Sequence, residues 1–143
     1  MSELAIDGVM IALANYLASA PLNLARTGPS IAMWAMEADS ARAADTWSVV
    51  RPHGGQASQV PVPDLAVQVY TVSKAGTGPA IVRAQALHSR LTDTIGRPLR
   101  DFAMGAFAIK GIRRLTLPGK IGVNEQGRPE VVFNFDLSFI PAD

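Results

Sequence analysis

Few side chains in this sequence are able to do acid–base, nucleophilic or metal chemistry. There are two histidines and no cysteine, which excludes disulfides, thiolate catalysis and cysteine-bound zinc. His88 follows Leu87 in a stretch of helical periodicity, and no carboxylate stands at helical spacing to orient it, so a packed or solvent-edge histidine is favoured over a general base. His53 precedes Gly54 and Gly55 without a G-x-S-x-G motif elsewhere, which indicates a turn residue. We therefore expect no catalytic residue, no metal site and no enzyme activity.

The segment Lys74–Pro79 is the strongest candidate for ligand binding. It lies between a predicted strand and a predicted helix, where backbone N–H groups can hold a phosphate. The segment lacks the G-x-x-x-x-G-K-[ST] pattern of a P-loop and the third glycine of a dinucleotide loop, and Pro79 removes one N–H donor. An ordinary strand-to-helix turn, with no cofactor, is the better interpretation.

Basic side chains gather in the second half of the chain. Arg97 and Arg100 flank a turn. Four further basic residues follow a predicted strand and its exit, and these are the candidate assembly contacts: Lys110, Arg113, Arg114 and Lys120. They have no interleaved aromatic residues, which a platform for single-stranded nucleic acid would need. Two interpretations stay open, a solvated strand end or a contact rim whose charges are repeated by the symmetry of a ring.

The pair Arg113 and Arg114 follows the predicted strand at the point where its alternation breaks down. We expect both side chains to face outward. Exposed charges contribute little to the stability of a monomer, so reversing both charges should leave the fold nearly intact while disrupting assembly or infectivity.

Composition limits the remaining classes of function. A chain of 143 residues that is 48% hydrophobic and 17% charged is expected to form one globular domain spanning 1–143, and its low charged fraction suggests subunit contacts. The net charge of +1 provides no long-range attraction to nucleic acid or to anionic membranes. Glu3 and Asp7 precede the first apolar run where a signal peptide would carry Lys or Arg, so a cytoplasmic start without a membrane span is expected.

Helices are predicted in two places. From Ser2 to about Ser19, apolar residues recur at three- and four-residue spacing. These are Ile6, Val9, Met10, Leu13 and Leu17. A second helix should begin with Pro79 at its first position and end before Gly96. Its predicted buried stripe is Ile81, Ala84, Leu87 and Leu91. The segment 21–45 stays open, with 31–36 either a short helix or a short strand.

Strands are predicted in the intervening segments. The first covers 46–51 and is ended by Pro52 and the glycine pair. The second covers 65–72, with leucine and valines on one face and Ala66, Gln68 and Tyr70 on the other. A third covers 106–112, with Gly111 as a bulge. The last is the clearest, because apolar and polar residues alternate over 132–139, and Gly127–Pro129 joins it to a short strand near 121–123. This order predicts an α+β fold, a mixed, mostly antiparallel β-sheet with helices packed on one face.

The order of these elements resembles the tail terminator, or minor tail completion, proteins of long-tailed bacteriophages, prophages and gene-transfer particles. The resemblance covers about residues 2–140 and rests on element order and pattern. It is carried by the first strand with its Val-Val-Arg-Pro-His-Gly-Gly end, the helix opening Gly-Pro-Ala-Ile-Val-Arg-Ala and the final Val-Val-Phe-Asn-Phe-Asp-Leu-Ser-Phe strand. The stretch 22–44 departs most from the family pattern.

The resemblance implies a virion structural protein at the head-proximal end of the tail, assembled in the host cytoplasm. Its implied partners are further copies in a hexameric ring, the tail tube protein and the head–tail connector protein, with double-stranded DNA passing through the ring without sequence-specific binding. The ring would cap the tail tube, stop its polymerisation and present a surface to the head. Another head–tail joining subunit, a tail tube subunit and a small-ligand-binding domain are the alternatives.

Overall fold

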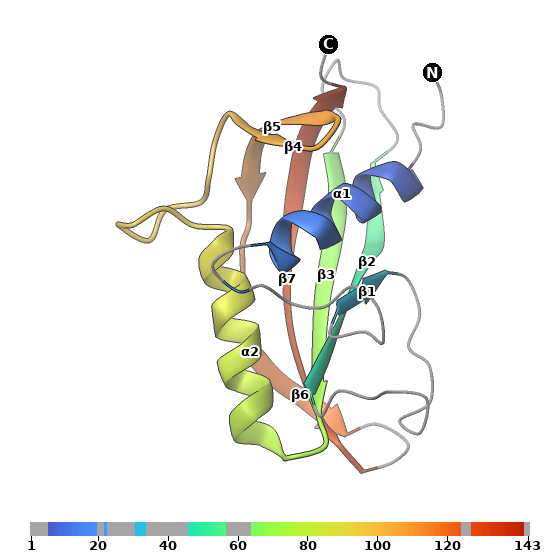
Figure 1. Cartoon of the computed structure of the whole chain (residues 1–143), viewed down its shortest axis with the longest axis vertical. Coiled ribbons are helices and arrows are strands. Elements are labelled where there is room, and N and C mark those ends of the chain that lie inside the picture. Colours follow the sequence, from blue (N-terminus) through green and yellow to red (C-terminus); the bar gives the residue numbers. More distant parts are fainter. Residues whose placement is uncertain are drawn as a thin grey trace.

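The computed structural model of the chain describes residues 6–19, 22, 31–33, 46–56, 64–123 and 127–141. Over these residues it contains two helices and seven strands (Figure 1). The helices are α1 (Ile6–Ala18) and α2 (Thr77–Arg90). The strands are β1 (Ile31–Met33), β2 (Thr46–Gln56), β3 (Asp64–Ser73), β4 (Phe102–Met104), β5 (Phe107–Arg113), β6 (Gly119–Val123) and β7 (Pro129–Pro141). Helices and a sheet combined in this way give the predicted α+β class.

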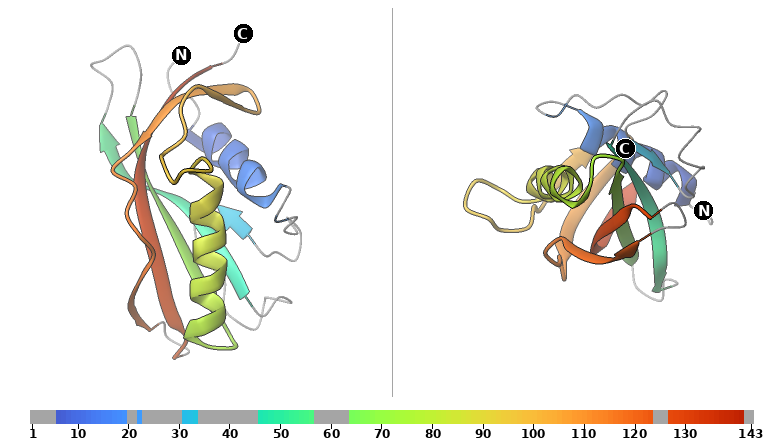
Figure 2. Two further views of the ribbon diagram at one scale, coloured as in Figure 1. Left: turned by 90° about the vertical axis from the view of Figure 1, so that its left-hand side faces the viewer. Right: turned by 90° about the horizontal axis from the view of Figure 1, so that it is seen from below.

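The described strands form one sheet in the order β1-β2-β3-β7-β5-β4, and β6 pairs with β7 beside that path. β1 runs parallel to β2, and the other described strand pairs are antiparallel. Both helices lie on the same side of the sheet, which curls around them (Figure 2). The predicted mixed, mostly antiparallel sheet with helices on one face is confirmed.

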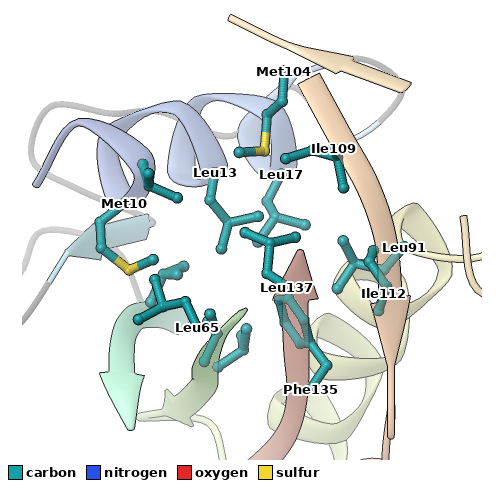
Figure 3. Packing of buried hydrophobic residues seen from close by; sticks show 14 of the residues in the cluster. Met10, Leu13, Leu17, Leu65, Leu91, Met104, Ile109, Ile112, Phe135 and Leu137 are labelled. Carbon is teal, nitrogen blue, oxygen red and sulfur yellow. The ribbon is translucent and has the colours of Figure 1, made fainter. Parts of the chain in front are cut away.

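The largest core lies between the helices and the sheet (Figure 3). β7 contributes the alternating residues that the sequence assigns to its apolar face: Phe133, Phe135, Leu137 and Phe139. α1 contributes four fully buried residues of its predicted stripe: Val9, Met10, Leu13 and Leu17. Each such side chain contributes roughly 1.5–3 kcal/mol relative to its exposed state. The apolar face of β7, which repeats every second residue, therefore packs in one core with the apolar face of α1, which repeats at helical spacing.

The opposite face of the sheet carries a second, smaller apolar cluster, which the sequence does not predict. It consists of Trp47, Val49, Tyr70, Val72 and Val132. Two residues of β3 that carry polar groups are nearly buried on this face: Tyr70 is 6% exposed, and Gln68 is 9% exposed. Polar partners explain why both side chains tolerate burial: the Tyr70 hydroxyl donates to Glu130, and Arg51 donates two hydrogen bonds to Gln68 Oε1.

β2 is longer than predicted and does not end at Pro52. It continues to Gln56 and shifts register against β3 between Pro52 and Gly55. A bulge accommodates proline and glycine inside a paired strand, because the residue left over there makes no ladder hydrogen bond. His53 accordingly lies within β2, and the predicted turn at this position is wrong.

α2 begins two residues earlier than predicted, at Thr77, so Pro79 is its third residue. The N–H groups of the first turn have no partner inside the helix, and proline is tolerated there for that reason. The buried residues are Ala80, Ala84 and Leu87, followed by Leu91 just past the helix, whereas Ile81 is half-buried at the edge of a small cluster. The predicted stripe is thus correct except at Ile81.

Two short strands clarify segments that the sequence leaves unassigned. β1 resolves the choice over 31–36 in favour of a strand at Ile31–Met33. β4 forms a hairpin with β5, which is not predicted, and β5 begins at Phe107. The bulge expected at Gly111 is confirmed by a register shift between Ile109 and Gly111. Residues 2–5 of the predicted first helix lie outside the described residues.

The two helices are joined at their C-terminal ends by Arg90. Its guanidinium lies 4.1 Å from the Tyr16 ring centroid and donates to the Tyr16 carbonyl at 3.0 Å and to Ser19 Oγ at 2.8 Å. The Tyr16 hydroxyl in turn donates to the carbonyl of Arg90. A cation at the C-terminus of α1 also complements the helix dipole. Arg90 therefore fixes α1 against α2, and with it the position of α1 over the sheet.

Candidate assembly surface

β5 and β6 follow one another along the same side of β7 and form one interrupted edge of the sheet, which β4 covers only at Phe107–Ile109. β7 has β3 on one side, and both β5 and β6 pair with its other side. β5 follows the C-terminal half of β7, and β6 follows the N-terminal half at Pro129–Val132. Between them the Thr116 N–H donates to the Asn134 carbonyl at 2.9 Å, so the chain stays along the same edge. The four predicted contact residues all lie on this edge.

Arg114 lies at the interruption and pairs with a buried carboxylate. Its Nε donates to Asp136 Oδ2 at 2.6 Å, and a second guanidinium nitrogen contacts the same oxygen. Asp136 is 8% exposed, whereas the Arg114 side chain is 81% exposed. Arg114 has φ 55°, a left-handed conformation that costs a residue with a side chain roughly 1–2 kcal/mol. The ion pair keeps the Arg114 side chain directed at β7 despite that backbone cost.

The other three basic residues have different surroundings. Lys110 forms an ion pair with Asp101 at 2.9 Å, and both side chains are largely exposed. Arg113 stands opposite Asp136 in the ladder, so it shares the face of the sheet that lacks the helices. Lys120 stands opposite Val131, whose side chain packs against α2. All four side chains are exposed, as expected for Arg113 and Arg114, but Lys120 and Arg113 lie on opposite faces of the sheet.

A hydrogen-bonded turn follows α2 and projects from the body of the molecule (Figure 1). The Asp93 carboxylate accepts the backbone N–H groups of Ile95 at 2.9 Å and Arg97 at 3.1 Å. Hydrogen bonds from the backbone of Arg97 and then of Ile95 lower the pKa of Asp93 below its usual range. A hollow of about 620 Å³ is lined by this turn and β5, with Arg97, Arg100 and Ile112 among its residues. The two arginines of the predicted turn are therefore neighbours of the β5 edge.

Asp93 is not among the predicted site residues, although the pattern Asp-Thr-Ile-Gly is typical of an Asx turn. The same applies to Asp136, which looks like one polar residue in an alternating strand. Asp136 carries no local signal for Arg114, its partner across the edge.

His88 lies on α2 against β7. Its ring meets Phe133 edge-on, with centroids 5.4 Å apart, and it is half-buried. Burial lowers the pKa of the imidazole below 6.5, and a hydrogen bond with the backbone of Thr116 partly offsets that effect. The prediction of a packed histidine is confirmed.

The burial of His88 should make stability depend on pH. Because the folded-state pKa lies below the unfolded value of about 6.5, the unfolded chain binds the proton more readily. The contribution of the neutral imidazole is fully present above about pH 6.5 and is lost as the pH falls through the folded pKa. Urea unfolding of wild type and His88→Gln at several pH values measures their free energies of unfolding. The difference between the two free energies should narrow or reverse as the pH is lowered. Equal pH profiles for the two proteins would contradict this expectation.

The remaining features concern the turn before α2, groups able to bind metal and the length of the helices. The turn after β3 enters α2 through Gly76 at φ 110°, and no side chain caps the helix there. Among the described residues, no three His, Asp or Glu side chains form a group able to hold a metal ion. Neither described helix is long and apolar enough to span a membrane. No protein-family model matches the chain, and no curated protein matches it.

Proposed function

We propose that this protein is a virion structural protein, a tail terminator that forms a ring at the head-proximal end of a phage-type tail. The ring, hexameric in this proposal, caps the tail tube, stops its polymerisation and offers the joining surface for the head–tail connector protein. Double-stranded DNA passes through it without sequence-specific contacts. The chain acts through assembly and not as an enzyme.

The observation that carries the proposal is the order of elements. Along the chain come α1, the short β1, two long antiparallel strands, α2, the β4–β5 hairpin, β6 and the long β7. Apart from the short strands β1 and β4, this is the order on which the resemblance to tail terminator proteins rests. It supports the proposal as a likeness of pattern.

The edge formed by β5 and β6 supplies a second line of support. It carries the basic residues and lies at the side of the sheet, where another protein can approach. Arg113 is exposed there, and Arg97 and Arg100 border the same edge. A charge at such a position contributes little to the stability of a monomer, whereas a closed ring repeats the charge once per subunit around a rim.

The test is the length of tails assembled without the protein. In a null mutant of the particle-forming element, heads should still package DNA while tails have uncontrolled length, because the growing tube has no steric stop. Electron microscopy of the particles measures this, with the mutant complemented by the wild-type chain as the control. Tails of normal length in the null mutant would favour another structural role.

A head–tail joining or tail tube subunit is the second candidate, since either would share the sheet and the basic edge. Locating the protein along purified particles separates these roles: a tube subunit is distributed along the tail, and a terminator is confined to one end.

A further inference from the structure

Three of the six large apolar side chains that are exposed among the described residues lie within seven residues of one another. Leu117 is 80% exposed, Ile121 is 60% exposed and Val123 is 57% exposed. We name these three residues the apolar strip. They lie on β6 and the segment leading into it, at the outer edge of the sheet.

β6 contributes nothing to the core. Every residue of Gly119–Val123 is exposed or half-buried, and none belongs to a core cluster. Among the described strands β6 pairs only with β7, so its second edge offers unpaired backbone groups. Soluble proteins usually protect such an edge with charges, proline or a cover, and here Lys120 is the single charge within the strand. An apolar, open edge of this kind is a surface for pairing with another chain.

A second apolar surface lies at the other end of β7. It is a groove of about 590 Å³ between α1 and the β4–β5 turn, which we name the α1 groove. Its lining includes Ile11, Ala12, Tyr16, Met104, Ala106 and Phe107. Ile11 is 44% exposed there. A groove of this volume can accept several aliphatic side chains.

The strip and the groove lie far apart within one molecule. β6 pairs with β7 near Val131 and Val132, whereas Phe107 stands opposite Pro141 at the far end of the same strand (Figure 1). The strip therefore cannot fill the groove of its own chain. Two different surfaces that meet between copies make a head-to-tail contact, the kind that closes into a ring when the rotation permits.

We propose that the apolar strip of one copy docks into the α1 groove of the next copy. This inference rests on the proposed ring and assigns its subunit contact. The strip leaves roughly 200 Å² of apolar side chain exposed, about a quarter of the ~800 Å² that each partner contributes to a stable interface. That is the scale of the desolvated centre of an interface, with a polar rim and the β6 backbone making up the remainder.

Sedimentation velocity of the full chain over a concentration series tests the contact. Ile121→Asp and, separately, Val123→Asp place a charge in the strip, and Ala106→Trp fills the groove. Each variant should shift self-association to roughly tenfold higher concentration or more. The matched controls are Val82→Asp on exposed α2 and Ala75→Trp on the turn after β3, both of which should associate as wild type does. Circular dichroism confirms that each variant is folded.

A mixing experiment separates a head-to-tail contact from other arrangements. A strip variant keeps an intact groove, and the groove variant keeps an intact strip. An equimolar mixture of Ile121→Asp and Ala106→Trp should therefore form one-to-one dimers that cannot grow. A mixture that stays monomeric, although each parent is folded, overturns the pairing of strip with groove.

The other outcomes are also decisive. Strip variants that associate as wild type does overturn the proposal, and so does a wild-type chain that is monomeric throughout the series. Loss of association in Ala106→Trp alone shows that the groove contacts another surface of the neighbouring copy, and this too overturns the pairing of strip with groove. The tail-length test is independent of these measurements, so the ring function can survive when this contact fails, and the contact can survive when the tail-length test fails.

Discussion

Phe135→Ala is expected to destabilise the fold by about 3–5 kcal/mol, because it removes a large ring from the centre of the main core. Phe135 is 2% exposed, stacks on Phe133 with centroids 6.2 Å apart and stands opposite Val67 of β3. Figure 3 shows its ring beside Leu137, among residues of α1 and the sheet and near Leu91, which follows α2. Such a loss is a large share of the roughly 5–15 kcal/mol typical of a domain.

Thermal unfolding followed by circular dichroism or calorimetry measures this effect. The melting temperature should fall by about 10 °C or more, and aggregation on heating should increase. Val82→Ala on the exposed face of α2 is the matched control, and it should change stability by no more than about 0.5 kcal/mol. An unchanged melting temperature for Phe135→Ala would show that the apolar face of β7 does not form the core.

Arg114→Glu should also destabilise the fold, by about 1–3 kcal/mol. The substitution leaves the Asp136 carboxylate without its guanidinium partner and brings a second negative charge toward it. Asp136 is nearly buried, which raises the cost of an unpaired charge, while the 81% exposure of the Arg114 side chain limits it through solvent screening.

Lys120→Glu is the matched control, because it reverses a charge on the same side of β7 but stands opposite the apolar Val131. Lys120 is exposed on β6, and we expect its reversal to change stability little and to be visible mainly in assembly. Chemical denaturation of the two variants side by side measures the difference. Equal stability of both variants would mean that the Arg114–Asp136 pair contributes nothing to the fold.

The ion pair between Arg114 and Asp136 changes the expectation for the double substitution of Arg113 and Arg114. Considered from sequence, two adjacent exposed arginines at a strand end should be reversible without loss of stability. In the structure Arg114 is joined to Asp136 on the neighbouring strand, and Arg113 stands opposite the same carboxylate, so reversing either charge also acts on the fold. The single variant Lys120→Glu is therefore the one to carry into particle assembly.

The sequence by itself determines the elements whose signal is local and periodic. Alternation over 133–139 identifies the buried face of β7, and the spacing of Val9, Leu13 and Leu17 identifies the buried face of α1. These patterns suffice because side chains on one face of a strand or helix must recur at its own period. Together with the turn residues, they predict the α+β class.

Only the tertiary structure decides which residues meet across the chain. Arg90 reaches Tyr16 over 74 residues, and Arg114 reaches Asp136 over 22 residues. The parallel pairing of β1 with β2, the second cluster around Trp47 and the strip of exposed apolar residues on β6 have the same origin. Neighbouring strands and the register between them set these contacts, and a one-residue shift in register moves a side chain to the other face. Local pattern carries no information about that choice, so the candidate assembly surface emerges from the fold.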